Sequence, residues 1–382
     1  MSIPIGPSRA WRMLCCLAAV IFAAIPWPTA AAAAASEDGG PAPSMFSFNA
    51  FGTFGIVHSN DTQADFVSNP NQPKGAGFSS AWSATPDTKL GMQLKANFSD
   101  RLSAVVQFVS QYQYDGTFLP DLEWGNVKYQ ITPDLNVRVG RIAIPTYMIS
   151  DSLNVGYTLP FVRIPMEIYS QLPITHSDGV DGSYRLHVGD VTNTVQAFAG
   201  KFDSKLPNHG FYNVQGMKGV SDTIEYGAAT LHFSYQTLRY DLSFPGLSLN
   251  GDPQAIASIG ANYDPGKWFV SAEWIRAPDD AVGRFYAWYA IAGYRIDKFT
   301  PYIDFARAYM GYPGPLGFPP FINQNTSSIG VRWDFMKSTD LKLQLDRTSL
   351  HGGIDQYFIN QQPAFKADGS VDVFSLAIDF VF

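Results

Sequence analysis

The sequence has 382 residues, of which 46% are hydrophobic and only 15% charged, with a formal net charge of −7. This apolar content excludes an intrinsically disordered chain, and the excess of acidic residues argues against a nucleic-acid partner. The six histidines are scattered without metal-ligand spacing, so we expect neither a metal site nor a cofactor.

The first 35 residues have the pattern of a secretory signal peptide. Arg9 and Arg12 precede an apolar run over residues 13–24, and alanines fill residues 30–35. The apolar run is too short for a transmembrane helix. We therefore expect cleavage before Ser36 and one domain over residues 36–382. Both cysteines lie in the cleaved segment, so the mature chain can form no disulfide.

The mature chain repeats one unit: a strand of about ten residues, a very short turn, a second strand and a longer loop. The strands are predicted from side chains that alternate with period two between apolar and polar. Sixteen are predicted, namely 45–57, then the pairs 89–98 with 102–111, 121–131 with 135–144, 176–187 with 193–202, 223–232 with 234–243, 254–263 with 267–276, 284–296 with 299–309 and 325–335 with 340–350, and finally 370–382. No clear turn signal marks the fourth pair, near residue 233.

The last strand has two different faces and ends on a phenylalanine. One face carries Phe374, Leu376, Ile378, Phe380 and Phe382, and the other carries Ser375, Ala377, Asp379 and Val381. An apolar face that meets lipid explains such an ending, in a strand that closes a barrel onto the first one. The terminal strand of a soluble β-sandwich is the alternative. The terminal phenylalanine resembles the C-terminal signature of Gram-negative outer-membrane barrels.

The even strand count, the signal peptide and the terminal phenylalanine together make the chain similar to the general porins. The resemblance implies an all-β fold, a membrane-spanning antiparallel β-barrel of sixteen strands in the outer membrane, with short periplasmic turns and long external loops. Aromatic residues near strand ends suit the membrane interfaces, at Tyr129, Trp268, Trp274, Tyr294 and Trp333.

The same resemblance implies a homotrimeric channel for passive diffusion of small hydrophilic solutes and ions. A solute-specific channel and a non-conducting structural or adhesive barrel are alternatives with the same fold, and a soluble secreted β-protein is a third. Barrel enzymes place a nucleophile or carboxylate beside a histidine. His176 and Asp178 are two residues apart, which is no evidence of such a pair, so we expect no enzyme.

Residues 145–173 form the third long loop. Four prolines prevent a strand pair, and long structureless loops are uncommon unless they are functional. The loop is rich in apolar and aromatic residues, so it must pack on something. It follows the fifth strand, where porins carry the loop that folds inward and narrows the pore. The alternative is an external loop packed over the barrel mouth. The acidic motif of enterobacterial porins is absent, so the match is one of position.

Charged side chains at the constriction set the selectivity of such a pore. The loop offers Asp151, Arg163 and Glu167, and the lumen-facing parity of the wall offers Lys95, Lys128, Arg138, Arg332 and Lys342. A basic wall that faces an acidic loop would set a transverse field. Acidic residues on the same inner faces leave the sign of the selectivity open, namely Glu273, Asp334, Asp346 and Asp379.

Overall fold

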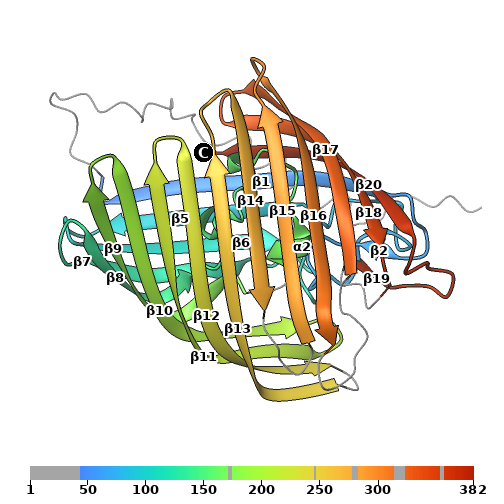
Figure 1. Cartoon of the computed structure of the whole chain (residues 1–382), viewed down its shortest axis with the longest axis horizontal. Coiled ribbons are helices and arrows are strands. Elements are labelled where there is room, and N and C mark those ends of the chain that lie inside the picture. The colour runs from blue at the N-terminus through green and yellow to red at the C-terminus, as the bar shows by residue number, and fades with distance from the viewer. Residues whose placement is uncertain (1–43, 171–173, 245–246, 278–282, 314–322, 353–356) are drawn as a thin grey trace, which may run out of the picture. The chain divides into compact units, whose positions relative to one another are not determined.

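The computed structural model describes residues 44–170, 174–244, 247–277, 283–313, 323–352 and 357–382. The predicted signal peptide, residues 1–35, lies outside the described residues. From Met45 on, the described chain forms one unit, whose strands surround a lumen (Figure 1).

Sixteen long antiparallel strands form a closed barrel, which confirms the predicted fold and strand number. The ring closes because β1 pairs with both β5 and β20, while every other strand pairs with its neighbours in sequence. The strands are β1 (Phe46–Ser59), β5 (Lys89–Asn97), β6 (Leu102–Gln111), β7 (Asp121–Gln130), β8 (Leu135–Ala143), β9 (His176–Val188), β10 (Val191–Leu206), β11 (Gly210–Tyr226), β12 (Ala229–Phe244), β13 (Leu247–Tyr263), β14 (Trp268–Ala277), β15 (Gly283–Tyr294), β16 (Phe299–Pro313), β17 (Asn323–Met336), β18 (Thr339–Leu350) and β20 (Ser370–Val381).

The remaining described elements are short. The strand β4 (Trp82–Ser83) adds to β1, while β2 (Asp65–Phe66), β3 (Ala76–Gly77) and β19 (Phe358–Ile359) form a separate three-stranded sheet. Two 3₁₀ turns, η1 (Ser150–Ser152) and η2 (Gly156–Thr158), and the helix α2 (Met166–Tyr169) all lie in the loop between β8 and β9. Among the described helices, none has the length and apolar content to cross a membrane.

The two ends of the barrel chain meet at the seam between β1 and β20. Phe54 lies opposite Ile378 in this pairing. The backbone N–H of Phe382 donates to the carbonyl of Ala50 at 2.8 Å, and the N–H of Ala50 donates to the carbonyl of Phe382 at 3.1 Å. The terminal phenylalanine therefore completes the hydrogen-bond ladder that leaves the barrel without an open edge.

The barrel wall is apolar outside and largely polar inside, as the alternation predicts. On β20, Ser375, Ala377 and Asp379 point inward and are fully buried, while Ile378 and, directly after the strand, Phe382 are exposed. The five predicted interface aromatics all lie on the outer surface, 38% to 48% exposed. Soluble proteins rarely expose a continuous band of apolar side chains, whereas membrane-spanning barrels carry one on their outer surface. This outer band is therefore the membrane-facing surface.

The predicted strand pair 223–232 with 234–243 is wrong in its position: residues 223–226 end β11, and residues 229–243 all lie in β12. Residue 233 lies inside β12, and the turn that joins β11 to β12 is at Gly227 and Ala228. Gly227 has a φ of +56°, a left-handed conformation that glycine adopts without steric cost. One glycine without a neighbouring Asn, Asp or Pro is a weak turn signal, so the sequence did not reveal it.

The strands β10 to β13 are longer than the membrane requires, with 16 or 17 residues each. The long loop expected over residues 203–222 is therefore not present. Residues 207–209 alone join β10 to β11, with left-handed φ values at Asn208 and His209. The polarity of the faces inverts along this extension. On β12 the inward residues change from His232 and Gln236 to the buried Leu238 and Tyr240.

Candidate functional site

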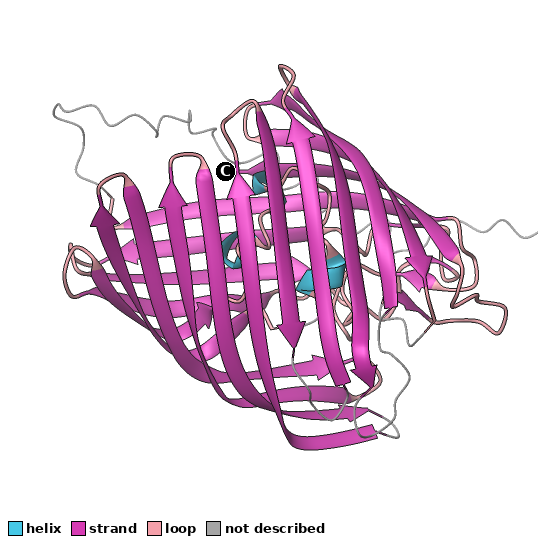
Figure 2. Ribbon diagram, in the orientation of Figure 1, coloured by secondary structure: helices cyan, strands magenta, loops and turns pink. Residues whose placement is uncertain are grey.

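The loop between β8 and β9 folds into the barrel, as predicted. Its helices lie inside the ring of strands (Figure 2). Near its start, the carbonyl of Thr146 accepts hydrogen bonds from the hydroxyls of Ser234 at 2.8 Å and Ser258 at 2.6 Å. The backbone N–H of Met148 then donates to Glu273 Oε1 at 2.7 Å. These polar wall residues of β12 to β14 hold the loop against the inner surface.

Further along, basic side chains of the opposite wall hold the loop by its backbone carbonyls. Each nitrogen satisfies an oxygen that the irregular backbone leaves unpaired. The bonds run from Lys89 Nζ to Leu153 O at 3.4 Å, from Lys342 Nζ to Gly156 O at 2.7 Å, and from Arg332 Nη1 to Tyr157 O at 2.6 Å and Leu159 O at 3.1 Å. The predicted wall residues Arg332 and Lys342 are thus engaged with the loop.

Acidic neighbours compensate these two cations. Lys342 Nζ lies 2.8 Å from Asp379 Oδ2 and 3.7 Å from Asp340 Oδ1, and all three side chains are fully buried. The guanidinium of Arg332 lies 2.8 Å from Asp334 and 3.1 Å from Asp340. Burying charges is costly unless they are paired, so the network is stable only while every member is present.

Gly156 fits this contact because it has no side chain. A Cβ atom at this position would lie 2.1 Å from Asp379 Oδ1 and 2.6 Å from Thr53 Oγ1. We expect Gly156→Ala to displace η2 from the wall and to destabilise the folded barrel by about 1–3 kcal/mol through overpacking. Heat-modifiability on gel electrophoresis measures this loss. Gly182→Ala on β9 is the control for a glycine substitution as such, since its φ is not left-handed and the nearest atom to its Cβ would be Asn136 O at 3.8 Å. An unchanged unfolding temperature in the Gly156 variant would show that η2 does not depend on this contact.

Arg163 connects the loop to two strands and to the loop before β5. Its guanidinium pairs with Asp87 at 2.8 Å and with Asp346, it donates to Ser375 Oγ, and it lies 4.9 Å from the centre of the Phe66 ring. Burial disfavours its charge, but the carboxylates of Asp87 and Asp346 outweigh burial and raise the pKa of Arg163. Arg163 therefore stays charged and holds the loop to β18, to β20 and to the loop before β5.

Glu167 lies in α2 and is 2% exposed. Its Oε1 accepts hydrogen bonds from Gln324 Nε2 at 2.7 Å and from Thr326 Oγ1. Burial raises the pKa of Glu167, although the two hydrogen bonds act in the opposite direction. This carboxyl group is therefore hydrogen-bonded to side chains of β17.

The wall of β5 to β8 carries a different set of charges. Lys95, Lys128 and Arg138 line one cavity of about 370 Å³ together with Trp124 and Asn126. Arg138 is paired, since its Nε donates to both carboxylate oxygens of Asp181 at 3.0 Å. The cavity contains polar side chains from neighbouring strands that point toward the lumen, so it suits water and hydrated solutes.

Asp151 lies at the tip of η1, where the loop faces this wall. Its side chain is exposed to the water of the lumen, and the charges that act on it are those of Arg138, Asp181 and His232. The surrounding protein restricts its hydration, and this desolvation raises the pKa of Asp151, although Arg138 acts against it. Asp151 is the acidic loop residue that the structure brings toward the basic wall.

The eight residues predicted for the constriction thus fall into two groups. Lys95, Lys128 and Arg138 line one cavity, and Asp151 on the loop is exposed and close enough to Arg138 for the two charges to interact. Arg163, Glu167, Arg332 and Lys342 are engaged in contacts between the loop and the wall. Lys89 and Asp340 also belong to the second group, although neither was among the residues predicted for the constriction. Their inward parity was the available signal, and it does not reveal a contact with the loop.

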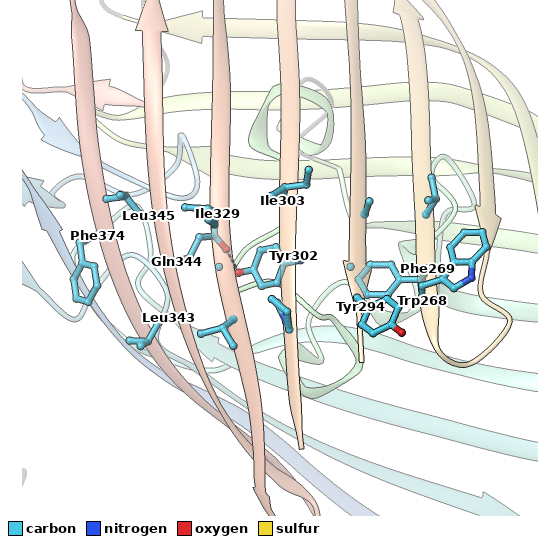
Figure 3. A pocket seen from close by; sticks show the side chains of 16 residues that line it. Trp268, Phe269, Tyr294, Tyr302, Ile303, Ile329, Leu343, Gln344, Leu345 and Phe374 are labelled. Carbon is cyan, nitrogen blue, oxygen red and sulfur yellow. Dashed lines mark hydrogen bonds between the residues drawn. The ribbon is translucent and has the colours of Figure 1, made fainter. Parts of the chain in front are cut away.

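A larger cavity, of about 710 Å³, lies on the outer wall and is not a solute site. Figure 3 shows the aromatic and aliphatic side chains that line it, among them Trp268, Ile303, Ile329, Leu345 and Phe374. These side chains belong to the membrane-facing band, and no group of converging polar residues accompanies them. Within the described part of the chain, no group of three or more His, Asp or Glu side chains is arranged to hold a metal ion.

The geometry defines a sixteen-stranded barrel with a loop docked in its lumen, which is the architecture of the general outer-membrane porins. Salmonella typhi OmpF in a complex with daunomycin has a TM-score of 0.58 and 13% identity, over 88% of this chain and 97% of that one. The outer-membrane channel DcaP of Acinetobacter baumannii has a TM-score of 0.57 and 11% identity, over 90% and 99%. The trimer form of OmpT, an outer-membrane protein of Vibrio cholerae, has a TM-score of 0.56 and 12% identity, over 88% and 99%.

No family model matches the sequence, and no curated protein matches it. At these identities the solved structures show a shared fold. They confirm the predicted porin-type barrel, and the activity has to be inferred from the residues of this chain.

Proposed function

We propose that the protein is an outer-membrane channel for passive diffusion of small hydrophilic solutes and ions. The observation that carries this proposal is the asymmetry of the lumen. The loop is fastened to β12–β18, β20 and β5, while the side that faces Lys95, Lys128 and Arg138 holds a water-accessible cavity. A barrel built only for structure has no need to keep charged side chains in such a space. DcaP, a barrel of the same fold, is an outer-membrane channel, which agrees with this proposal.

The constriction in this proposal lies between the tip of the loop and the wall of β5 to β8. Asp151 contributes the acidic side, and Lys95, Lys128 and Arg138 contribute the basic side. The resulting transverse field orients dipolar solutes and slows apolar ones. The remaining predicted residues, Arg163, Glu167, Arg332 and Lys342, act by fixing the position of the loop.

The proposal includes export, location and assembly. Residues 1–35 act as a cleaved signal peptide, and residues 36–382 form a barrel whose apolar band contacts outer-membrane lipid. We expect a homotrimer, as in the trimer form of the Vibrio cholerae protein. Electrophoresis of unheated protein, with mass determination in detergent, measures the assembly. A single-barrel mass under all conditions would contradict the trimer.

The decisive experiment is the current through detergent-folded protein in a planar bilayer. We expect stepwise increases of current of uniform size, since each homotrimer that inserts adds the same number of pores. Folded, heat-modifiable protein that gives no current would replace the proposal with a non-conducting structural or adhesive barrel. Block of the current by one defined solute among many would favour a solute-specific channel.

A pH series of the reversal potential under a salt gradient tests the role of Asp151. The pKa of this carboxyl group is raised above its ordinary value, mainly because the surrounding protein desolvates it, so it takes up its proton at a higher pH than an ordinary aspartate does. We expect the permeability ratio of cation to anion to fall as the pH is lowered from 7 through the titration of this group. Asp151→Asn should show the low ratio at every pH of the series. Asp115→Asn, in the exposed loop before β7, is the control. An unaltered pH profile in the Asp151 variant would place the titrating group elsewhere.

A further inference from the structure

We propose that Lys95 and Lys128 form a binding site for small anions that carry a carboxylate or a phosphate group. The inference rests on the proposed channel function and specifies the class of solute that pauses in the channel. It starts from a difference between these two lysines and the other cations that point into the barrel.

The other inward-facing cations considered above are satisfied within the protein. Lys89, Arg332 and Lys342 donate to loop carbonyls, and Arg138 and Arg163 pair with carboxylates. Lys95 and Lys128 form neither a hydrogen bond nor an ion pair with any residue that the structure describes. Two ammonium groups in one cavity without a protein partner leave their donors available to an anion.

The strand register brings the two lysines to one place on the wall. Lys128 lies directly opposite Ser103 on β6 and Arg138 on β8. Lys95 lies opposite Val105, which in turn lies opposite Asn126. The two lysines are thus two strands and one inward-facing position apart, roughly 10 Å across the sheet. Their long flexible side chains can reach a common anion between them.

The row of the wall that carries Lys95 continues into three glycines. Asn126 of this row lies opposite Gly140, Gly140 lies opposite Gly179, and Gly179 lies opposite Gly200. These three positions add no side chain to the row that lies next to Lys128, Arg138 and Asp181. The cavity of about 370 Å³ is large enough for a hydrated phosphate or a small carboxylate.

The charges around the cavity favour an anion. Lys95, Arg138 and Arg185 lie close enough to act on Lys128, and Asp181 is the acid that acts on it. Asp181 is already neutralised by Arg138 and by a hydrogen bond from Gln196 Nε2 at 2.6 Å. Asp100, at the short-turn end, also lines the cavity, and Asp151 faces it from the loop. Because Arg138 and Asp181 compensate each other, three cations, Lys95, Lys128 and Arg185, remain against two acids, Asp100 and Asp151.

The test compares the wild type with Lys95→Gln/Lys128→Gln. Single-channel chloride current is recorded in a bilayer while inorganic phosphate or acetate is added separately at constant ionic strength. For the wild type we expect saturable reduction of the chloride current by one or both anions. In the double variant we expect the half-saturating concentration to rise at least about tenfold. Lys201→Gln/Lys218→Gln, which removes two exposed lysines from the outer faces of β10 and β11, should behave as the wild type.

The outcomes separate this inference from the channel proposal. Saturation by phosphate alone indicates a phosphorylated solute, and saturation by acetate alone indicates a carboxylate. Open channels whose current neither anion saturates, or an equal effect in the double variant, overturn the binding site while the channel remains. If no channel opens, titration calorimetry of the detergent-solubilised protein with phosphate and acetate decides. Heat of binding that the double variant lacks supports the site, and its absence from the wild type overturns it.

Discussion

Replacing Arg163 by glutamine is expected to release the loop from the barrel wall and to increase the unit conductance. The guanidinium pairs with Asp87 and Asp346, and the side chains of all three residues are at most 7% exposed. Removing one partner of a buried ion pair leaves charge uncompensated, which costs about 3–5 kcal/mol. Here two carboxylates lose their partner at once. Bilayer recordings measure the conductance, and the temperature of heat-modification measures the stability of the folded barrel.

Arg347→Gln is the matched control for this change. Arg347 lies on the outer side of β18, one residue after Asp346, and its side chain is 66% exposed beside Asp372 at 3.6 Å. Surface ion pairs of this kind contribute about 0–1 kcal/mol. We therefore expect wild-type conductance and a nearly unchanged unfolding temperature. If the Arg163 variant matched this control in both measurements, the loop would be held by its other contacts alone.

Lys342→Met is expected to have an effect of similar size for a different reason. The ammonium group is fully buried between Asp379, Asp340 and the carbonyl of Gly156. Methionine fills the volume but leaves both acids without their shared cation, again about 3–5 kcal/mol less stable. We expect a lower temperature of heat-modification together with a larger and noisier current, since η2 loses its anchor.

A double variant separates charge compensation from loop anchoring at this position. Replacing a whole buried ion pair by apolar residues is often neutral, so Lys342→Met/Asp379→Leu should recover part of the lost stability. The hydrogen bond to Gly156 O stays absent, so the current should stay abnormal. Lys298→Met, at an exposed turn, controls for removal of a lysine. Full recovery of the wild-type current in the double variant would argue against the anchoring role of Lys342.

The barrel could be predicted from the sequence because lipid and water impose opposite demands on alternate residues. The faces of the last strand are an example: Phe374 and Ile378 lie outside and Asp379 inside, as their parity predicts. The same rule identified Lys95, Lys128, Lys342 and other cations as inward-facing. It failed at residue 233, where alternation continues through β12 and only Gly227 marks the turn.

Which of the inward-facing charged residues contact the loop, and which face the water of the lumen, could not be predicted in this way. Parity states which side of the wall a residue faces, but not whether a loop carbonyl lies within reach of it. Lys128 and Lys342 are equivalent by parity, yet Lys342 donates to Gly156 O and Lys128 has no such partner. The difference depends on the path of residues 144–170 across the lumen, which is fixed by contacts far apart in the sequence.

Those distant contacts have a consequence for the order of folding. Arg163 contacts Ser375, 212 residues away, and Val162 contacts Gln344, 182 residues away. Contacts of such sequence separation form late, and these need both ends of the ring in place. A slip of one residue in any pairing would turn the acceptors of the wall toward lipid. The loop can therefore dock in the lumen only after the barrel has closed in the correct register. Its docking then stabilises this register over registers shifted by one residue.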